Sequence, residues 1–157
     1  MIIQPKSIRK VLQVALATII VLGVVIFISI IYESKKDISD DIRFSKLLNT
    51  PIQVRSTSTI RWNKNNIRFK HYTLNQNEDS NYDLEDVKSV KKYQIGDTIY
   101  FYAAKSYKSM HVGENFYLIS KDTLNNGDII EFEYYTASDY SPEIWETEKE
   151  FLKRVRD

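Results

Sequence analysis

The chain has 157 residues, enough for one domain and an anchor, and its net charge of +1 gives no basic footprint for nucleic acid. It contains no cysteine, which excludes disulfides, thiol nucleophiles and iron–sulfur clusters. With only two histidines and four glycines, we expect no metal site, no cofactor and no glycine-rich phosphate loop.

An uncharged, apolar segment of 22 residues runs from Val11 to Tyr32. About 20 such residues in a helix cross the ~30 Å hydrocarbon core of a bilayer. The basic residues of the N-terminal tip are Lys6, Arg9 and Lys10, and mixed charges follow the segment. Because basic flanks stay in the cytoplasm, we predict that residues 1–32 are a cytoplasmic tip and a transmembrane anchor, with residues 33–157 outside. A cleaved signal peptide is the alternative, but its apolar region is shorter, about 7–15 residues, and ends at a small-x-small site.

Residues 33–50 predict a short helix. Ile38 and Ile42 recur near one helical face, and Ser39 is a suitable N-cap. Pro51 disfavours helical geometry in the residue before it and so ends the segment. We interpret this stretch as a juxtamembrane stalk, with a partner-binding helix as the alternative.

From residue 51 the apolar period changes to two, which predicts a β-rich domain over residues 51–157. A strand over 52–62, a turn at 63–66 and a second strand over 67–74 would form a hairpin. His71 falls within the second alternating run, so we interpret it as a packed or surface strand residue rather than as a ligand or base.

Residues 75–92 are polar and predict a long loop, with a short helix over 83–90 as an option. The acidic residues of this stretch are Asp79, Asp83, Glu85 and Asp86. Their spacing does not match the calcium-binding loop pattern of alternating acidic positions closed by glycine and glutamate. We therefore interpret them as a solvated run of charge.

A glycine–acid pair followed by an apolar alternation occurs three times. The copies begin at Gly96-Asp97, Gly113-Glu114 and Gly127-Asp128. Glycine relieves a tight turn and the acidic residue bonds local amides, so a strand can begin at once. This echo predicts three consecutive antiparallel strands at about 98–104, 115–121 and 129–136.

The last 17 residues, 141–157, predict an amphipathic helix. Ser141 would cap it and Pro142 would take the first helical position. The expected apolar stripe consists of Trp145, Leu152 and Val155. Glu150 precedes Arg154 at the spacing that favours an ion pair.

These elements indicate a mainly β (α+β) fold: a transmembrane helix, a stalk helix, a small antiparallel sheet or barrel, and a C-terminal helix packed on it. Apolar bulk on both faces of the strands, together with 11 tyrosines, leaves aromatic surface that would suit a peptide, a glycan or a partner protein.

One stretch resembles the membrane-anchored serine–lysine signal peptidases, especially those of conjugation systems. The segments that carry the resemblance are Ser109-Met110-His111-Val112-Gly113, Leu124 to Ile130 with its Gly127-Asp128, and Leu152-Lys153-Arg154-Val155. The resemblance implies Ser109 as nucleophile and Lys153 as base, a dyad that requires burial to lower the lysine pKa. The sequence departs from the family at His111, where a proline is usual, and at Lys153, whose surroundings predict a helix in place of a strand.

The leading hypothesis is a non-enzymatic, anchored domain that serves as an accessory or protein-interaction subunit of an envelope complex. Its partners would be the lipid bilayer and another envelope or membrane protein, with no nucleic acid. The alternatives are a signal-peptidase-like hydrolase, or a degenerate relative, and a glycan- or peptide-binding module.

Overall fold

The computed structural model describes residues 5–66, 68–78, 80–110, 112–136 and 141–156. The chain divides into two units, Met1–Ser34 with Lys108–Gly113, and Lys35–Tyr107 with Glu114–Asp157. Ile67, Asp79 and His111, which enter the predictions above, lie outside the described residues.

Helix α1, Pro5–Ile31, is long and apolar enough to span a membrane. Its mean hydropathy is 2.4 over Ile8–Phe27, and every side chain in that stretch is exposed. Thr18 Oγ1 donates to the carbonyl of Val14 at 2.9 Å, so this hydroxyl is satisfied within the helix. A helix that is apolar on all faces is typical of a membrane span or of a signal sequence.

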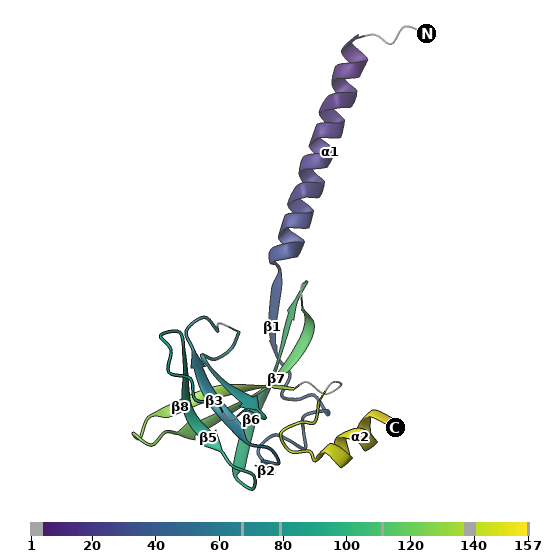
Figure 1. Cartoon of the computed structure of the whole chain (residues 1–157). Helices are drawn as coiled ribbons and strands as arrows, with labels where there is room; N and C mark the ends of the chain where they lie inside the picture. The colour runs from purple at the N-terminus through teal and green to yellow at the C-terminus, as the bar shows by residue number, and fades with distance from the viewer. Residues whose placement is uncertain (1–4, 67, 79, 111, 137–140, 157) are drawn as a thin grey trace. The chain divides into compact units, whose positions relative to one another are not determined.

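Eight strands form one open sheet (Figure 1). They are β1 Glu33–Asp37, β2 Pro51–Gln53, β3 Ser58–Asn63, β4 Tyr72–Gln76, β5 Val87–Tyr93, β6 Thr98–Ser109, β7 Gly113–Thr123 and β8 Ile129–Thr136. The order is β1-β6-β7-β8-β4-β3-β5, and β2 also pairs with β6. The mainly β prediction is confirmed, whereas a closed barrel is wrong. The sheet is also mixed, because β4 and β8 pair in parallel.

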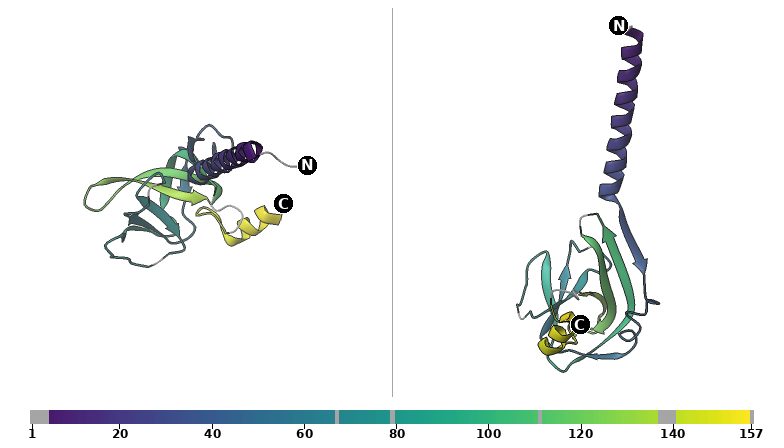
Figure 2. Two further views of the ribbon diagram at one scale, coloured as in Figure 1. Left: turned by 90° about the horizontal axis from the view of Figure 1, so that it is seen from above. Right: turned by 90° about the vertical axis from the view of Figure 1, so that its right-hand side faces the viewer.

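The glycine–acid echo marks the three consecutive strands β6, β7 and β8. β6 begins at Thr98 and β8 at Ile129, as predicted, and β7 begins at Gly113 itself. All three glycines of the echo have positive φ, between 68° and 100°, which a residue with a side chain rarely adopts. Figure 2 shows these strands from two further directions. The predicted role of glycine in these turns is therefore confirmed. Of the acidic residues, Asp97 accepts from the amide of Gln94 at 2.7 Å as predicted, whereas Asp128 accepts from the side chain of Asn126 at 2.6 Å.

The predicted hairpin exists as the antiparallel pair β3–β4, with Ser58 opposite Gln76 and Trp62 opposite Tyr72. Its second strand begins at Tyr72 rather than at residue 67, and a loop of residues 64–71 takes the place of the predicted strand. His71 lies exposed just before β4, with its Nδ1 3.4 Å from the carbonyl oxygen of Asn63.

Strand β5 lies where the sequence predicts a loop. It pairs with β3 and is the last strand on its side of the sheet. The strand reads VKSVKKY, and lysines on an edge strand discourage pairing with other chains. Because the segment is polar, its sequence does not show the apolar alternation that predicts a strand. The optional helix over 83–90 is also wrong, because those residues form turns and the start of β5.

The predicted stalk helix over 33–50 is wrong. Its first residues form β1 beside β6, and the amide of Ile38 donates to the carbonyl of Ala104 at 2.9 Å. The turns that follow bury Phe44 in the core. Pairing along β6 and burial of this ring outweigh the weak local preference for helix, since a short helix gains little without tertiary packing.

Helix α2, Glu148–Arg156, begins later than predicted, and Ser141-Pro142 do not start it. Thr147 caps it: the Thr147 amide donates to Glu150 Oε2 at 2.8 Å and the Glu150 amide to Thr147 Oγ1 at 3.3 Å, a capping box. The predicted pair is wrong as well, because Arg154 binds Glu146 rather than Glu150.

The helix does not pack on the sheet as predicted, because none of its side chains is buried. Of the expected stripe, Leu152 and Val155 are exposed. Trp145 alone packs against the core, from the segment that precedes the helix.

The core lies on the inner face of the sheet. Its fully buried side chains include Val54, Ile60, Phe101, Leu118 and Phe132. The ring of Phe132 lies 6.4 Å from that of Tyr93 on β5, between ring centroids. Strands far apart in the sheet order therefore contact the same core.

We predict that Phe132→Ala lowers the free energy of unfolding by about 3–5 kcal/mol, because the ring is fully buried and its removal leaves a cavity. The Tyr100 side chain on β6 is 58% exposed, so Tyr100→Ala should change the free energy of unfolding by about 0.5 kcal/mol or less. Urea unfolding of residues 33–157 followed by circular dichroism measures both. Equal losses in the two variants would contradict this core.

Candidate binding pocket

The 64–71 loop is held on the outer face of the sheet, opposite the core, by the carboxylate of Glu133. This side chain is only 1% exposed, near the middle of β8. Its Oε1 accepts from Asn66 Nδ2 at 2.9 Å, and its Oε2 accepts from the amides of Phe69 and Lys70 at 3.1 and 3.0 Å. Three donors to one buried carboxylate satisfy its charge without a cation.

Aromatic side chains pack between this loop and the sheet. The Phe69 ring meets Tyr117 edge-on at 5.5 Å, and Tyr117 lies 5.5 Å from Tyr135. Tyr117 also belongs to a small buried cluster with Ala103, Tyr107 and Ile119, separate from the main core. The surplus tyrosines of β6–β8 are thus partly structural and partly the wall of a pocket.

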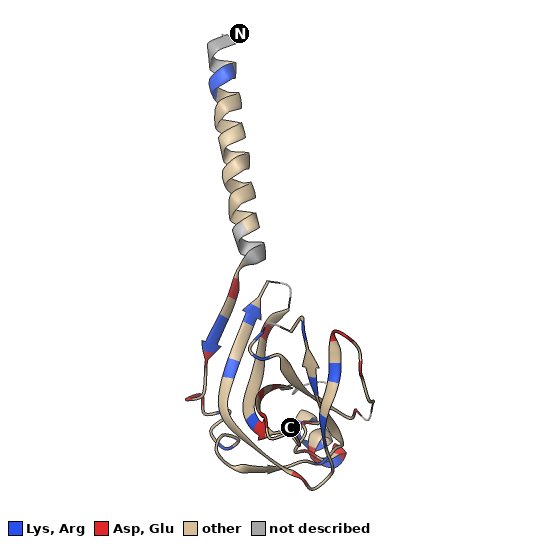
Figure 3. Ribbon diagram, turned by 90° about the vertical axis from the view of Figure 1, so that its left-hand side faces the viewer, with Lys and Arg blue, Asp and Glu red and all other residues tan. Residues whose placement is uncertain are grey.

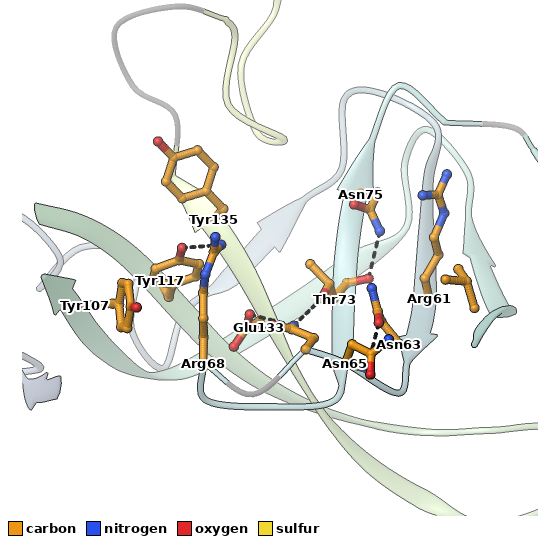
Figure 4. A pocket seen from close by; sticks show the side chains of 12 residues that line it. Arg61, Asn63, Asn65, Arg68, Thr73, Asn75, Tyr107, Tyr117, Glu133 and Tyr135 are labelled. Carbon is orange, nitrogen blue, oxygen red and sulfur yellow. Dashed lines mark hydrogen bonds between the residues drawn. The ribbon is translucent and has the colours of Figure 1, made fainter. Parts of the chain in front are cut away.

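The pocket has a volume of about 500 Å³ and lies among the loop, β3, β4 and the outer face of β6–β8 (Figure 4). Its lining is largely polar or aromatic: Arg61, Asn63, Asn65, Asn66, Arg68, Thr73, Asn75, Val87, Tyr107, Tyr117, Glu133 and Tyr135. The volume is in the range of small-ligand sites, about 300–1,000 Å³.

The two arginines of the pocket differ in their partners. Arg61 forms an ion pair with Glu78 and stacks on the ring of Tyr82. Arg68 is exposed, donates to the Tyr117 hydroxyl at 2.7 Å and lies over the Tyr107 and Tyr117 rings. In the part of the chain that the structure describes, no carboxylate forms an ion pair with Arg68. Its charge is available to a ligand.

The Tyr117 side chain lines the pocket although it is only 1% exposed. Its hydroxyl accepts from Arg68, and among the described residues no acceptor takes its own proton. Burial raises the pKa of Tyr117 to about 12, against a smaller lowering by Arg68, so the group stays a donor at neutral pH. The pocket therefore presents a cation and a phenolic donor side by side.

The two residues implied by the signal-peptidase resemblance lie on different elements, Ser109 on β6 and Lys153 on α2. Ser109 is the last residue of β6 and is nearly buried. Lys153 is exposed on α2 and lines no part of this pocket. A lysine base needs a buried position, and Lys153 is exposed. The catalytic assignment stays a prediction without support from these positions.

Among the described residues, no group of three or more His, Asp or Glu side chains is placed to hold a metal ion. In the acidic run considered for calcium, Asp83, Glu85 and Asp86 are exposed. The Nζ atom of Lys64 lies 4.0 Å from Glu85 Oε1 and 3.8 Å from Asp86 Oδ1. Asp79 lies outside the described residues.

A second buried carboxylate lies on the core side. Glu143 is 4% exposed; the Tyr134 hydroxyl donates to its Oε2 at 2.7 Å and accepts from the Ile144 amide at 2.9 Å. Burial raises the pKa of Glu143 to about 7, which the bond from Tyr134 partly opposes and the charge of Glu146 reinforces. These contacts fix the segment that carries Ile144 and Trp145 into the core.

We predict that Glu143→Gln raises the free energy of unfolding relative to the wild type, and that this increase grows with pH. Because the pKa is about 7 in the folded chain and about 4.5 when unfolded, the folded state prefers the neutral acid. That preference stabilises the protein fully below pH 4.5 and is lost as the pH rises to about 7. Between pH 4.5 and 7.5, the free energy of unfolding of the glutamine variant should therefore rise by about 3 kcal/mol relative to that of the wild type. Urea unfolding across this range measures the difference, with exposed Glu148→Gln as control; a difference independent of pH would contradict the raised pKa.

Comparison of the chain with known protein families, with characterised proteins and with solved structures finds no match. The pocket is therefore the feature of the chain that indicates a function. In the sequence, the 11 tyrosines predicted an aromatic binding surface, and two of those that line the pocket are Tyr117 and Tyr135. Arg68 and Glu133 gave no signal, because nothing local shows that residues 64–71 fold over β8.

Proposed function

We propose that this chain is a single-pass membrane protein whose β domain lies outside the cytoplasm and acts by binding, as a non-enzymatic accessory subunit of an envelope complex. The anchor is α1, and the basic tip before it supports a cytoplasmic N-terminus. The β domain would then meet the lipid surface and other envelope components.

The pocket is the observation that carries the binding role. Its one carboxylate, Glu133, accepts three hydrogen bonds that fix the 64–71 loop. Two of its groups, Arg68 and the Tyr117 hydroxyl, are donors suited to holding a ligand. This combination favours recognition over chemistry, and it supports a glycan- or peptide-binding module as a second candidate.

We predict that a reporter active only outside the cytoplasm, fused to the C-terminus of the full chain, is active. The basic residues Lys6, Arg9 and Lys10 precede the apolar segment and should stay inside. A reporter active only in the cytoplasm, fused at the same place, serves as the control. Activity of this second fusion alone would reverse the orientation.

We predict that Ser109→Ala and Lys153→Ala keep both the abundance of the protein and its biological effect. Under the hydrolase alternative each change would remove a catalytic group and cost several orders of magnitude in turnover. The measurement is complementation of a strain that lacks the protein, with Phe132→Ala as the variant expected to lose abundance. A Ser109→Ala protein that folds normally and complements nothing would place the serine hydrolase first.

A further inference from the structure

We propose that the pocket beneath the 64–71 loop binds an acidic saccharide, whose carboxylate pairs with Arg68. This assignment rests on the binding role proposed above and names its ligand class. It depends on the charge, the lining and the surroundings of the pocket.

The charge of the pocket favours an anion. Arg68 has no carboxylate partner among the described residues, and a guanidinium matches a carboxylate through two parallel hydrogen bonds. A second cation, Lys105, lies beside the loop: its ammonium is 5.6 Å from the ring centroid of Phe69, and it also interacts electrostatically with the carboxylate of Asp37. Figure 3 shows basic residues on β6, and both basic and acidic residues on its neighbour β1. The Glu133 carboxylate already accepts three hydrogen bonds, so it would bind a cation only weakly.

The lining favours a ligand rich in hydroxyl groups. Asn63, Asn65 and Asn75 carry both donors and acceptors, and Val87 is the only aliphatic side chain among the lining residues. Asn63 Oδ1 already accepts from the Asn65 amide at 2.9 Å, and Asn75 Nδ2 donates to the carbonyl of Thr73 at 3.1 Å. The remaining donors and acceptors of these side chains match hydroxyl groups better than large apolar groups. Tyr135, 40% exposed, presents part of an aromatic ring at the wall, a surface on which the C–H face of a sugar ring packs.

The strands around the pocket disfavour a peptide. Extended peptides bind by adding a strand to a free sheet edge. β4 pairs with β3 and β8, and β8 pairs with β7 and β4, so both strands have partners on either side. Val87 belongs to the edge strand β5, but the lysines of that strand discourage the addition of another strand. The groups offered here are side chains, which suit a saccharide of one or two units.

The test is a binding measurement on the full chain in lipid nanodiscs, which avoids sugar-based detergents. The probes are digalacturonic acid and its neutral counterpart α-1,4-galactobiose, followed by isothermal titration and by amide chemical shifts. We expect the acidic disaccharide to bind at least tenfold more tightly than the neutral one, because only the first reaches Arg68 with a charge-assisted pair. Shifts should appear at Arg68, Asn75 and Tyr135.

The variants separate a charge effect from a pocket effect. Arg68→Gln should weaken digalacturonic acid at least tenfold and leave galactobiose within about twofold. Arg156→Gln removes an equal charge on α2, outside the pocket, and should change neither affinity. Arg68 is an exposed loop residue, so circular dichroism of its variant should match the wild type.

The outcomes are distinct. Equal binding of the two sugars, no binding of the acidic sugar at millimolar concentration, or an Arg68→Gln variant with unchanged affinity would each overturn the acidic-saccharide assignment. Tighter binding of unblocked tetraglycine or of inorganic phosphate at the same residues would overturn it in favour of a peptide carboxylate or a phosphate. None of these results bears on the orientation or on the Ser109 and Lys153 variants, so the proposed function stands or falls on its own tests.

Discussion

Three consecutive residues of β8 join the strands β6, β7 and β8 to the strands β4, β3 and β5. The parallel pairing of β4 with β8 spans only Phe132, Glu133 and Tyr134 on the β8 side. Because successive strand residues face opposite sides, Phe132 and Tyr134 enter the core while Glu133 faces the outer surface. The first packs against β5, the second fixes the C-terminal segment through Glu143, and Glu133 fixes the 64–71 loop. One short pairing thus sets the core, the C-terminus and the pocket.

This arrangement explains why a charged residue is buried in the middle of a small sheet. An unpaired carboxylate there would be costly, but three donors from the 64–71 loop replace its hydration. The loop gains a fixed position in return, which a stretch of eight residues with only two apolar side chains would not find through burial alone. Phe69 adds ring contact with Tyr117 on the same side. The pocket wall therefore owes its shape to a buried charge rather than to regular secondary structure.

The sequence indicated the elements that local chemistry decides. Positive-φ glycines mark β6, β7 and β8, and uninterrupted apolar residues mark α1. It did not indicate β1 or β5, because both are polar, lysine-containing strands whose existence depends on distant partners, β6 and β3. The same holds for the pocket. Arg68 lies in a run that alternates like a strand, and only the bonds to Glu133 show that it belongs to a loop.

A membrane anchor changes what such a pocket needs to achieve. Arg68 is exposed, so solvent and salt weaken a single contact with an anion. On the proposed assignment, the affinity of one domain for one short saccharide would therefore be modest. Copies of the chain held by α1 in one membrane would face a polymeric ligand together, and each further contact becomes nearly intramolecular once the first has formed. On the proposed assignment, the anchor supplies through avidity the strength that the open pocket lacks, and a short saccharide in solution competes poorly with a long one.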